Sequence, residues 1–327
     1  MLKILEEEAA IRKFRRQFIG SFKPFIDAKI RTNLGHPGGA SLANVFWSDR
    51  LGIWVFHEKA FGNRCGHAFG VEKPAKTSSV PITCEINFPL HGIDRRMGGA
   101  LAKDRDGQVF LVHRGKIGGG KKGVGKAFFE KYYRGAWAVM DDGNSETVVA
   151  LVGALHSPRL ARQVAQFVRK IGRIKELVLP SSPQGELTFD DHSFREEIVG
   201  AGYDQTDGTD VSCDHGLVVA DLYAALSRKG LKVGNDAVHD LFIVNTVGKI
   251  TSVYQVMTNH SKPALHAGMS RLLLGSVDLP AKPRLLLAVP AGIDHDLSSK
   301  LKKLGIDILE YRWQAEYAVF PGIHEFI

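Results

Sequence analysis

Asp240, Gln255 and Met257 have the spacing of a group of side chains that acts together from two neighbouring strands. Residues 238–258 predict a β-hairpin, with a glycine-containing turn at 246–249. Asp240 lies early in the first strand, whereas Gln255 and Met257 point to the same face of the second because strand side chains alternate. We therefore expect the three side chains to converge, with two oxygen donors of the kind that Mg²⁺ accepts.

The pattern of Asp240, fourteen residues, and Gln255-Val256-Met257 resembles the catalytic hairpin of the PD-(D/E)XK nuclease superfamily, the restriction-endonuclease-like fold. In that family the hairpin carries Asp, then Glu or Asp, one spacer and Lys. The resemblance implies that Asp240 and Gln255 hold any Mg²⁺ or Mn²⁺ ion and that Met257 stands at the lysine position. The order of predicted elements over 194–320 agrees with it, and the first half of the chain does not take part.

Two of the three catalytic positions carry the wrong residue type for hydrolysis. Gln255 keeps an amide oxygen but removes one negative charge from a site that holds a cation by charge. Met257 has an uncharged thioether, which neither donates a proton nor balances a phosphate. Arg271 stands where active relatives carry a Gln on the following helix. We expect these vestigial positions to support little or no cleavage.

Three other residues enter the same hypothesis. Lys262, or Lys249 in the turn, is a candidate for a displaced catalytic lysine, and Glu197 is a candidate acidic residue on a preceding helix. The alternative is a fold without nuclease ancestry, in which Asp240 begins a strand and Gln255 is an ordinary sheet residue.

The surrounding pattern predicts an α/β class, α+β overall. Helices and strands alternate through the second half, which is typical of an α/β/α sandwich: helix 215–230, the hairpin, helix 262–276, strand 284–290, helix 294–304 and strand 306–311. The resemblance makes this a restriction-endonuclease-like domain over 193–327. Pro and Ser within 177–192 indicate a linker, and 1–176 is then a separate N-terminal domain.

Charge divides the chain in the same way. Residues 1–175 contain 30 Lys and Arg against 15 Asp and Glu, while residues 176–327 contain 13 against 20. A strongly basic half neutralises nucleic-acid phosphates and releases their counterions. We expect the N-terminal domain to grip DNA. The alternatives are a solubilising surface and a dock for an acidic partner.

The densest basic segment is the glycine-rich stretch 114–126. Glycines let the backbone approach a phosphate closely, and nearby cations add charge. The expected DNA-binding residues, with two arginines that precede the segment, are Arg95, Arg96, Arg114, Lys116, Lys121, Lys122 and Lys126. Residues 120–126 nearly match a nucleotide P-loop, but Ala127 stands where a hydroxyl must ligate Mg²⁺. A solvated linker is the third interpretation.

The N-terminal domain is expected to be β-rich. Strands are predicted at 82–88, 98–103 and 108–114, with Asp106-Gly107 as a hairpin turn, whereas 35–70 reads as loop-rich and aromatic. Most of those rings are expected to fill a core, although one or two in a base-binding pocket is the sharper alternative.

Cysteine and hydropathy patterns narrow the setting. Cys65, Cys84 and Cys213 are too widely spaced for a disulfide framework or a common structural zinc site, so a reducing cytoplasm is expected. Apolar runs are too short to span a bilayer, and the first residues lack a signal-peptide pattern.

The leading hypothesis is a cytoplasmic, homodimeric DNA-binding protein whose nuclease-like domain is degenerate. Its layout resembles that of modification-dependent restriction proteins, which implies double-stranded, base-modified DNA as the partner. The alternatives are an endonuclease that uses Mg²⁺ or Mn²⁺ in a rearranged site, and a nucleotide-binding regulator built on 120–126.

Overall fold

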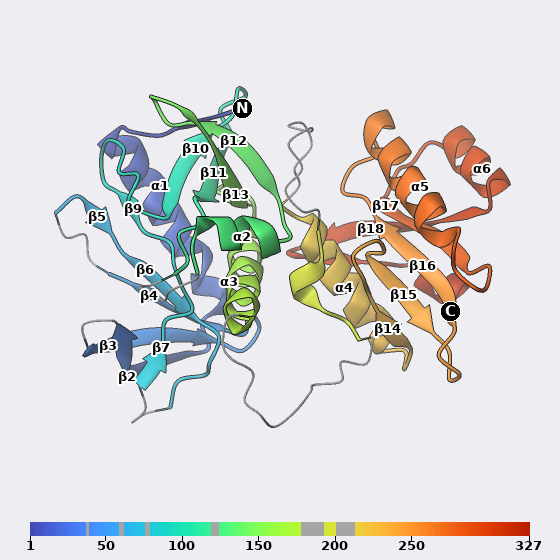
Figure 1. Cartoon of the computed structure of the whole chain (residues 1–327), viewed down its shortest axis with the longest axis horizontal. Coiled ribbons are helices and arrows are strands. Elements are labelled where there is room, and N and C mark those ends of the chain that lie inside the picture. Colours follow the sequence, from blue (N-terminus) through green and yellow to red (C-terminus); the bar gives the residue numbers. More distant parts are fainter. Residues whose placement is uncertain (37–38, 59–61, 76–78, 119–123, 178–192, 201–212) are drawn as a thin grey trace. The chain divides into compact units, whose positions relative to one another are not determined.

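The chain divides into two compact units. The computed structural model describes residues 1–36, 39–58, 62–75, 79–118, 124–177, 193–200 and 213–327 (Figure 1). The first unit comprises Met1–Pro180 with Ala201–Cys213, and the second comprises Ser181–Gly200 with Asp214–Ile327. The expected linker at 177–192 lies almost wholly outside the described residues. The expected division at a single linker places Cys213 in the C-terminal domain, whereas in the structure Cys213 belongs to the first unit.

The first unit contains a five-stranded closed barrel with the strand order β1-β10-β11-β13-β12. Its strands are β1 (Leu2–Ile4), β10 (Gly99–Lys103), β11 (Val109–His113), β12 (Trp137–Asp141) and β13 (Glu146–Ala154). Buried apolar side chains from all five strands, including Ile4, Ala102, Val112, Met140 and Val149, form one cluster. Because every strand contributes, these side chains fill the barrel.

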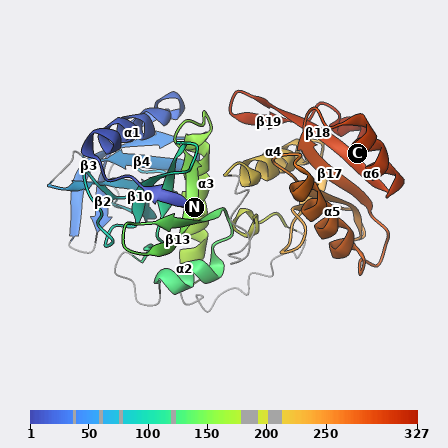
Figure 2. The ribbon, with the colours of Figure 1, turned by 90° about the horizontal axis from the view of Figure 1, so that it is seen from above.

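Two further sheets complete the strands of this unit. The six-stranded sheet has the order β7 (Ser79–Pro81), β2 (Ala28–His36), β3 (Gly39–Ser48), β4 (Ile53–His57), β6 (His67–Gly70) and β8 (Cys84–Glu85), and the small sheet pairs β5 (Arg64–Cys65) with β9 (Phe88–Pro89). The helices among its described residues are α1 (Glu8–Ser21), η1 (Lys23–Phe25), α2 (Lys126–Tyr132) and α3 (Leu160–Glu176), of which α1, α2 and α3 are labelled in Figure 2.

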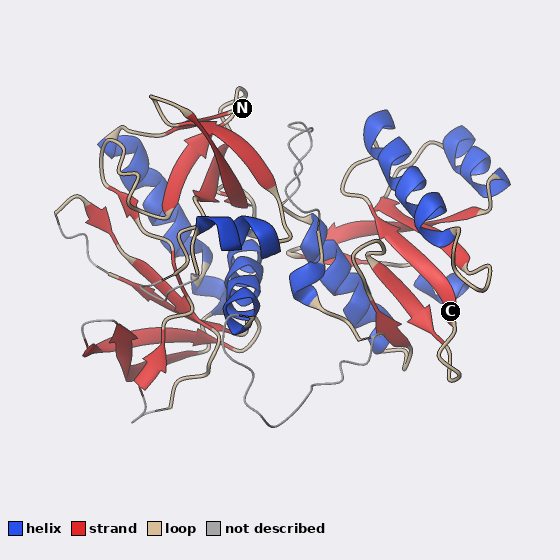
Figure 3. Cartoon of the chain, in the orientation of Figure 1, coloured by secondary structure: helices blue, strands red, loops and turns tan. Residues whose placement is uncertain are grey.

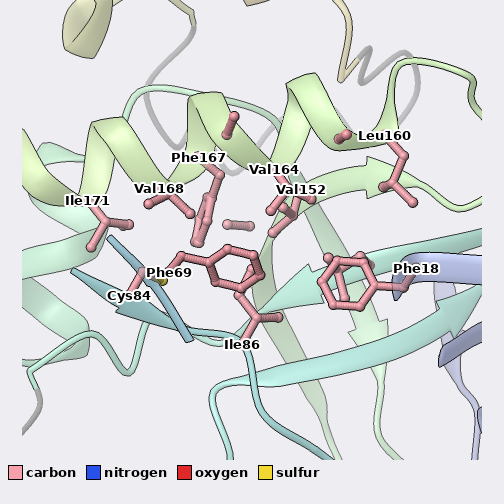
Figure 4. Close-up of a cluster of buried hydrophobic side chains, with 14 of the residues drawn as sticks. Phe18, Phe69, Cys84, Ile86, Val152, Leu160, Val164, Phe167, Val168 and Ile171 are labelled. Atoms are coloured by element: carbon pink, nitrogen blue, oxygen red, sulfur yellow. The ribbon is translucent and has the colours of Figure 1, made fainter. Parts of the chain in front are cut away.

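Helix α3 joins the barrel to the six-stranded sheet. It contacts β13 of the barrel and β4, β6 and β8 of the sheet. Its apolar residues recur at helical spacing, and Leu160, Val164, Phe167 and Ile171 are each at most 2% exposed. Figure 4 shows these side chains facing Phe18, Phe69 and Ile86 in one cluster. Burial of this apolar surface is the main term that holds the unit together.

The second unit is built on one mixed six-stranded sheet, in the order β14-β15-β16-β17-β18-β19. Its elements are η2 (Glu196–Ile198), α4 (His215–Ser227), β14 (Lys232–Gly234), β15 (Leu241–Val244), β16 (Ile250–Val256), α5 (Lys262–Ser276), β17 (Arg284–Pro290), α6 (His295–Lys303), β18 (Ile306–Gln314), β19 (Tyr317–Val319) and η3 (Ile323–Phe326). Strands β14 to β16 are antiparallel, whereas β16, β17 and β18 run parallel.

Helices cover both faces of this sheet (Figure 3). One core cluster packs Leu222 of α4 against strand residues such as Tyr254 and Leu286. The other packs Leu272 of α5 and Leu301 of α6 against the opposite face. The strands β16 and β17 are therefore covered on both sides, which explains the continuous apolar run at 285–289 in β17.

The mixed α and β class is confirmed. The expected hairpin at 238–258 is also present as β15 and β16, although β15 begins at Leu241. Its start is delayed because the Asp236 carboxylate accepts the backbone N–H groups of Val238 and His239, which makes a turn there. The expectation of a loop-rich segment at 35–70 was wrong, since much of it forms β3, β4, β5 and β6.

The close packing of β4 against β6 gives a direct test of this arrangement. An added Cβ at Gly70 would lie 2.3 Å from the fully buried Trp54 ring, whereas nothing lies within 4 Å of one at Gly20 in α1. We expect Gly70→Ala to destabilise the first unit by about 1–3 kcal/mol. Gly20→Ala is the matched control, with a gain of roughly 0.5–1 kcal/mol from helix propensity. Urea unfolding followed by tryptophan fluorescence measures both, and an unperturbed Gly70→Ala protein would contradict the packing.

Candidate functional site

Asp240 is the centre of a hydrogen-bonded group in the second unit. Its Oδ2 atom accepts hydrogen bonds from Gln255 Nε2 at 2.5 Å, from the backbone N–H of Val256 at 2.8 Å and from His215 Nε2 at 3.1 Å. Asp240 and Gln255 are 8% and 3% exposed. The buried carboxylate therefore obtains three donors from the protein itself, which compensates the cost of its burial.

The hairpin register explains why Asp240 and Gln255 meet. Leu241, the first residue of β15, pairs with Tyr254 of β16, so the preceding Asp240 lies beside Gln255. Both side chains lie on the sheet face covered by α5, as the alternation of Phe242 and Val253 in that core shows. The predicted convergence of Asp240 and Gln255 is thus present in the structure.

Met257 lies on the same face but has a packing role. Its side chain is part of the core cluster under α5, and its sulfur lies 2.4 Å from the position of an added Cβ at Gly268. Its backbone N–H donates to Ala288 O at 2.8 Å, and its carbonyl accepts from Tyr311 Oη at 3.1 Å. The thioether therefore fills the space that Gly268 leaves on the helix.

The remaining predicted residues of this site are not hydrogen-bonded to Asp240 and lie on other elements. Lys262 is exposed at the first residue of α5, and Arg271 is exposed further along that helix. Lys249 is exposed in the turn between β15 and β16, at the end of the hairpin opposite to Asp240. Glu197 lies in the short helix η2 and is partly exposed.

His215 is a member of the site that the hairpin pattern did not indicate. It is the first residue of α4, and its side chain is 22% exposed while it bonds Asp240. The sequence predicted it only as the first residue of the helix at 215–230. The signal that was present is a histidine at the start of the helix that precedes the hairpin, but no local rule connects residues 25 positions apart.

A second histidine next to the site carries charge. His239 Nδ1 faces the Asp236 carboxylate at 2.9 Å, and its Nε2 faces the carbonyl of Gly275 at the end of α5 at 3.1 Å. Both partners are acceptors, so this geometry favours the imidazolium form, in which both ring nitrogens donate. Burial opposes this charge, but the hydrogen bond and attraction of Asp236 raise the pKa of His239 above its ordinary value. The pair ties the loop before β15 to α5.

The residues at the predicted catalytic positions do not fit a Mg²⁺ site. Such a site needs several oxygen ligands with negative charge, whereas Gln255 directs its Nε2 donor at Asp240 and Met257 contributes a thioether to the core. In the described ranges, no group of three or more His, Cys, Asp or Glu side chains has the arrangement of a metal site. The chemistry that the group does support is internal hydrogen bonding.

The predicted DNA-binding residues of the first unit fall into two kinds. Arg95 is half exposed and holds the buried Asp142 carboxylate through Nε at 2.9 Å and Nη2 at 3.0 Å. Arg96 holds Asp94 in the same two-point way, with its side chain 91% exposed. Lys126 begins α2 and pairs with Glu130 at 3.5 Å. These three are accessible cations.

Arg114 is the exception, because it is only 5% exposed. The expectation that it lies on a DNA-facing surface does not match this burial. Its Nη1 donates to the carbonyl of Met97, in the loop that precedes β10, at 3.4 Å and to the carbonyl of Gly99, the first residue of β10, at 3.3 Å. Lys116 is exposed and donates to the Arg95 carbonyl. Lys121 and Lys122 lie outside the described residues.

The aromatic residues of 35–70 fill cores for the most part. Trp54 and Phe69 are fully buried, and Trp47 is 6% exposed. Cys65 and Cys84 are buried free thiols. Burial raises the pKa of the Cys84 thiol to about 12, which makes it unreactive near neutral pH.

Comparison of the chain with family models, with curated proteins and with solved structures gave no significant match. Within the described part of the chain, every helix is too short or too polar to cross a membrane.

The charged pair beside Asp240 predicts a pH dependence of stability for the second unit. His239 has a raised pKa, so its contribution is fully present below its unfolded value of about 6.5 and is lost as the pH rises through the folded pKa. Burial acts to raise the pKa of Asp236, but the hydrogen bonds from His239 to its carboxylate outweigh this and lower the pKa below its ordinary value. Its contribution is present above its unfolded value of about 3.9 and is lost as the pH falls through the folded pKa.

We therefore expect the unfolding temperature of the second unit to fall as the pH rises above about 6.5. The fall should shrink in Asp236→Asn, which removes the partner that holds the proton on His239. Thermal unfolding at several pH values measures both proteins. The same loss of stability in the variant would show that this pair is not its source.

Proposed function

We propose that the protein binds double-stranded DNA through its basic first unit, and that its second unit is a PD-(D/E)XK-like domain that does not hydrolyse DNA. The layout resembles that of modification-dependent restriction proteins, and we take base-modified DNA as the target class. Binding without cutting then makes the protein a DNA-binding factor rather than a nuclease.

The order of elements supports a nuclease-like second unit. Helix α4 is followed by the antiparallel strands β14, β15 and β16, then by α5 and the parallel strand β17. Asp240 precedes β15 and Gln255 lies on β16, on the face covered by α5. These are the positions at which the family resemblance places the metal ligands.

The occupancy of Asp240 Oδ2 carries the proposal that hydrolysis is lost. In an active relative this carboxylate is expected to bind a metal ion. Here three donors take the same oxygen, and one of them is the side chain at the second ligand position, Gln255. The lysine position is filled by Met257, packed at Gly268. A metal ion would have to displace these three hydrogen bonds, and it would gain only one carboxylate ligand.

The charge of the first unit supports DNA binding. Residues 1–175 have twice as many Lys and Arg as Asp and Glu. Among the predicted DNA-binding residues, the exposed ones are Arg95, Arg96, Lys116 and Lys126. Phosphate neutralisation by such side chains releases counterions, so affinity depends steeply on salt.

The proposal predicts retardation of DNA without cleavage. The full chain is incubated with base-modified and unmodified plasmid of the same sequence, with Mg²⁺, Mn²⁺ or chelator, and both retardation and cutting are scored on one gel. We expect retardation under all three metal conditions, stronger for modified DNA, and a loss of affinity of about tenfold or more between 50 and 200 mM salt. Metal-dependent cutting would instead establish an endonuclease with a rearranged site.

The hydrogen bond between Asp240 and Gln255 predicts a metal response for one variant. Gln255→Glu would place two carboxylates in contact, which is unfavourable until a proton or a cation joins them. We expect a lower unfolding temperature for this variant at pH 7.5 and a saturable recovery with Mn²⁺, because a ligand that binds only the folded state stabilises it. The natural protein and the uncharged Gln255→Met control should show no such recovery. An equal rise with Mn²⁺ in the natural protein would contradict the loss of the metal site.

A further inference from the structure

Six charged residues of the first unit form what we call the arginine cluster: Asp94, Arg95, Arg96, Arg114, Lys116 and Asp142. They come from the loop before β10, the segment after β11 and the turn between β12 and β13. Ion pairs join Arg95 to Asp142 and Arg96 to Asp94, and Lys116 donates to the Arg95 carbonyl. Arg114 lies within electrostatic range of Asp142, Arg95 and Asp94.

The three arginines of the cluster differ in how one edge of the guanidinium is used. Nε and Nη2 lie on the same edge and together fit two oxygens of a carboxylate or phosphate. Arg95 directs these two nitrogens at Asp142, and Arg96 directs them at Asp94. In Arg114 the Nε and Nη2 atoms are buried and have no acceptor among the described residues.

A guanidinium keeps its charge in proteins, so Arg114 cannot relieve this situation by losing a proton. Its Nη1 has two carbonyl partners, but carbonyls do not neutralise a charge. The neighbouring His113 adds no charge, because burial lowers its pKa to about 4 and its Nδ1 accepts the N–H of Gly115. Asp142 and Asp94 lie within electrostatic range of Arg114, but each is already paired with another arginine. A further anion would therefore offset the cost of burying the guanidinium.

The charge balance of the arginine cluster indicates which anion fits. Asp142 and Asp94 are matched by Arg95 and Arg96, which leaves Arg114 and exposed Lys116 as an excess of two positive charges. A phosphomonoester carries nearly two negative charges at neutral pH. A phosphodiester within a DNA strand carries one. The planar edge of Arg114 and the ammonium of Lys116 are the two kinds of donor that proteins use for phosphate.

We propose that Arg114 and Lys116 form a site for one terminal phosphate group. The choice of a terminal group follows from charge, because a phosphomonoester matches the excess of two positive charges and a diester within a continuous strand does not. The assignment of a DNA 5′ end as the carrier rests on the proposed DNA binding, whereas binding of inorganic phosphate at the same site does not.

Inorganic phosphate is the first probe, titrated into the full chain by calorimetry and by thermal unfolding, with potassium acetate at equal ionic strength as the salt control. We expect saturable binding and a rise in unfolding temperature that acetate does not reproduce. Lys116→Gln should weaken phosphate binding by roughly tenfold, the size expected for one charge-assisted hydrogen bond. Arg114→Met should abolish it. The matched control, Lys103→Gln, removes the same charge from an exposed barrel position and should bind as the natural protein does.

Lys116 is exposed, so its variant tests the site even where Arg114→Met fails to fold. Absence of saturable phosphate binding, or equal binding by Lys116→Gln and the natural protein, would overturn the site.

The DNA probes are two duplexes of one sequence, with 5′-phosphate or 5′-hydroxyl ends. Tighter binding of the phosphorylated duplex, lost in Lys116→Gln, supports the 5′ end as the carrier. Equal binding of both duplexes rejects that carrier and leaves DNA binding intact. Phosphate binding without binding of either duplex supports the site and rejects the proposed function.

Discussion

A buried charge must find its counterpart inside the protein or in a ligand, and the second unit is organised around a carboxylate that finds it inside. Asp240 Oδ2 draws together the start of α4 through His215, the strand β16 through Gln255 and the backbone of Val256. Removal of one donor would leave a buried carboxylate undersatisfied, at a cost of about 1–3 kcal/mol. The same residue therefore fixes the hairpin against the helix that precedes it.

The neighbouring imidazolium extends this network. His239 joins Asp236 to the carbonyl of Gly275, so a positive charge one residue from Asp240 lies at the C-terminal end of α5, where the helix dipole favours it. Helix α5 is thereby attached to the loop before β15 as well as to the sheet through its apolar face. Interactions that would serve metal binding in an active nuclease serve the packing of the proposed nuclease-like domain.

The hairpin could be predicted from sequence because its signals are local. Strand alternation and the turn at 246–249 depend on neighbouring residues, and so does the shared face of Gln255 and Met257. The contact of Asp240 with His215 was not predictable in this way, because His215 lies on a helix that comes near the hairpin only in the folded protein. Strands β3 and β6 were missed because exposed residues such as Leu42 and buried glycines such as Gly70 obscure their alternation.

Arg114 shows the opposite limit of sequence patterns. Its place before a glycine- and lysine-rich segment is typical of a solvent-facing phosphate contact. The side chain is nevertheless buried, and its Nη1 donates to the carbonyls of Met97 and of Gly99 at the start of β10. Water and salt screen the attraction between an exposed charge and an anion. The attraction is stronger for a buried charge, because the dielectric constant of its surroundings is lower. Asp240 obtains its hydrogen-bond donors from within the protein. The Nε and Nη2 atoms of Arg114, by contrast, have no acceptor among the described residues. If the proposed function holds, the ligand-dependent charge of this protein lies in the first unit, and phosphate recognition there does not require the nuclease-like domain to bind metal.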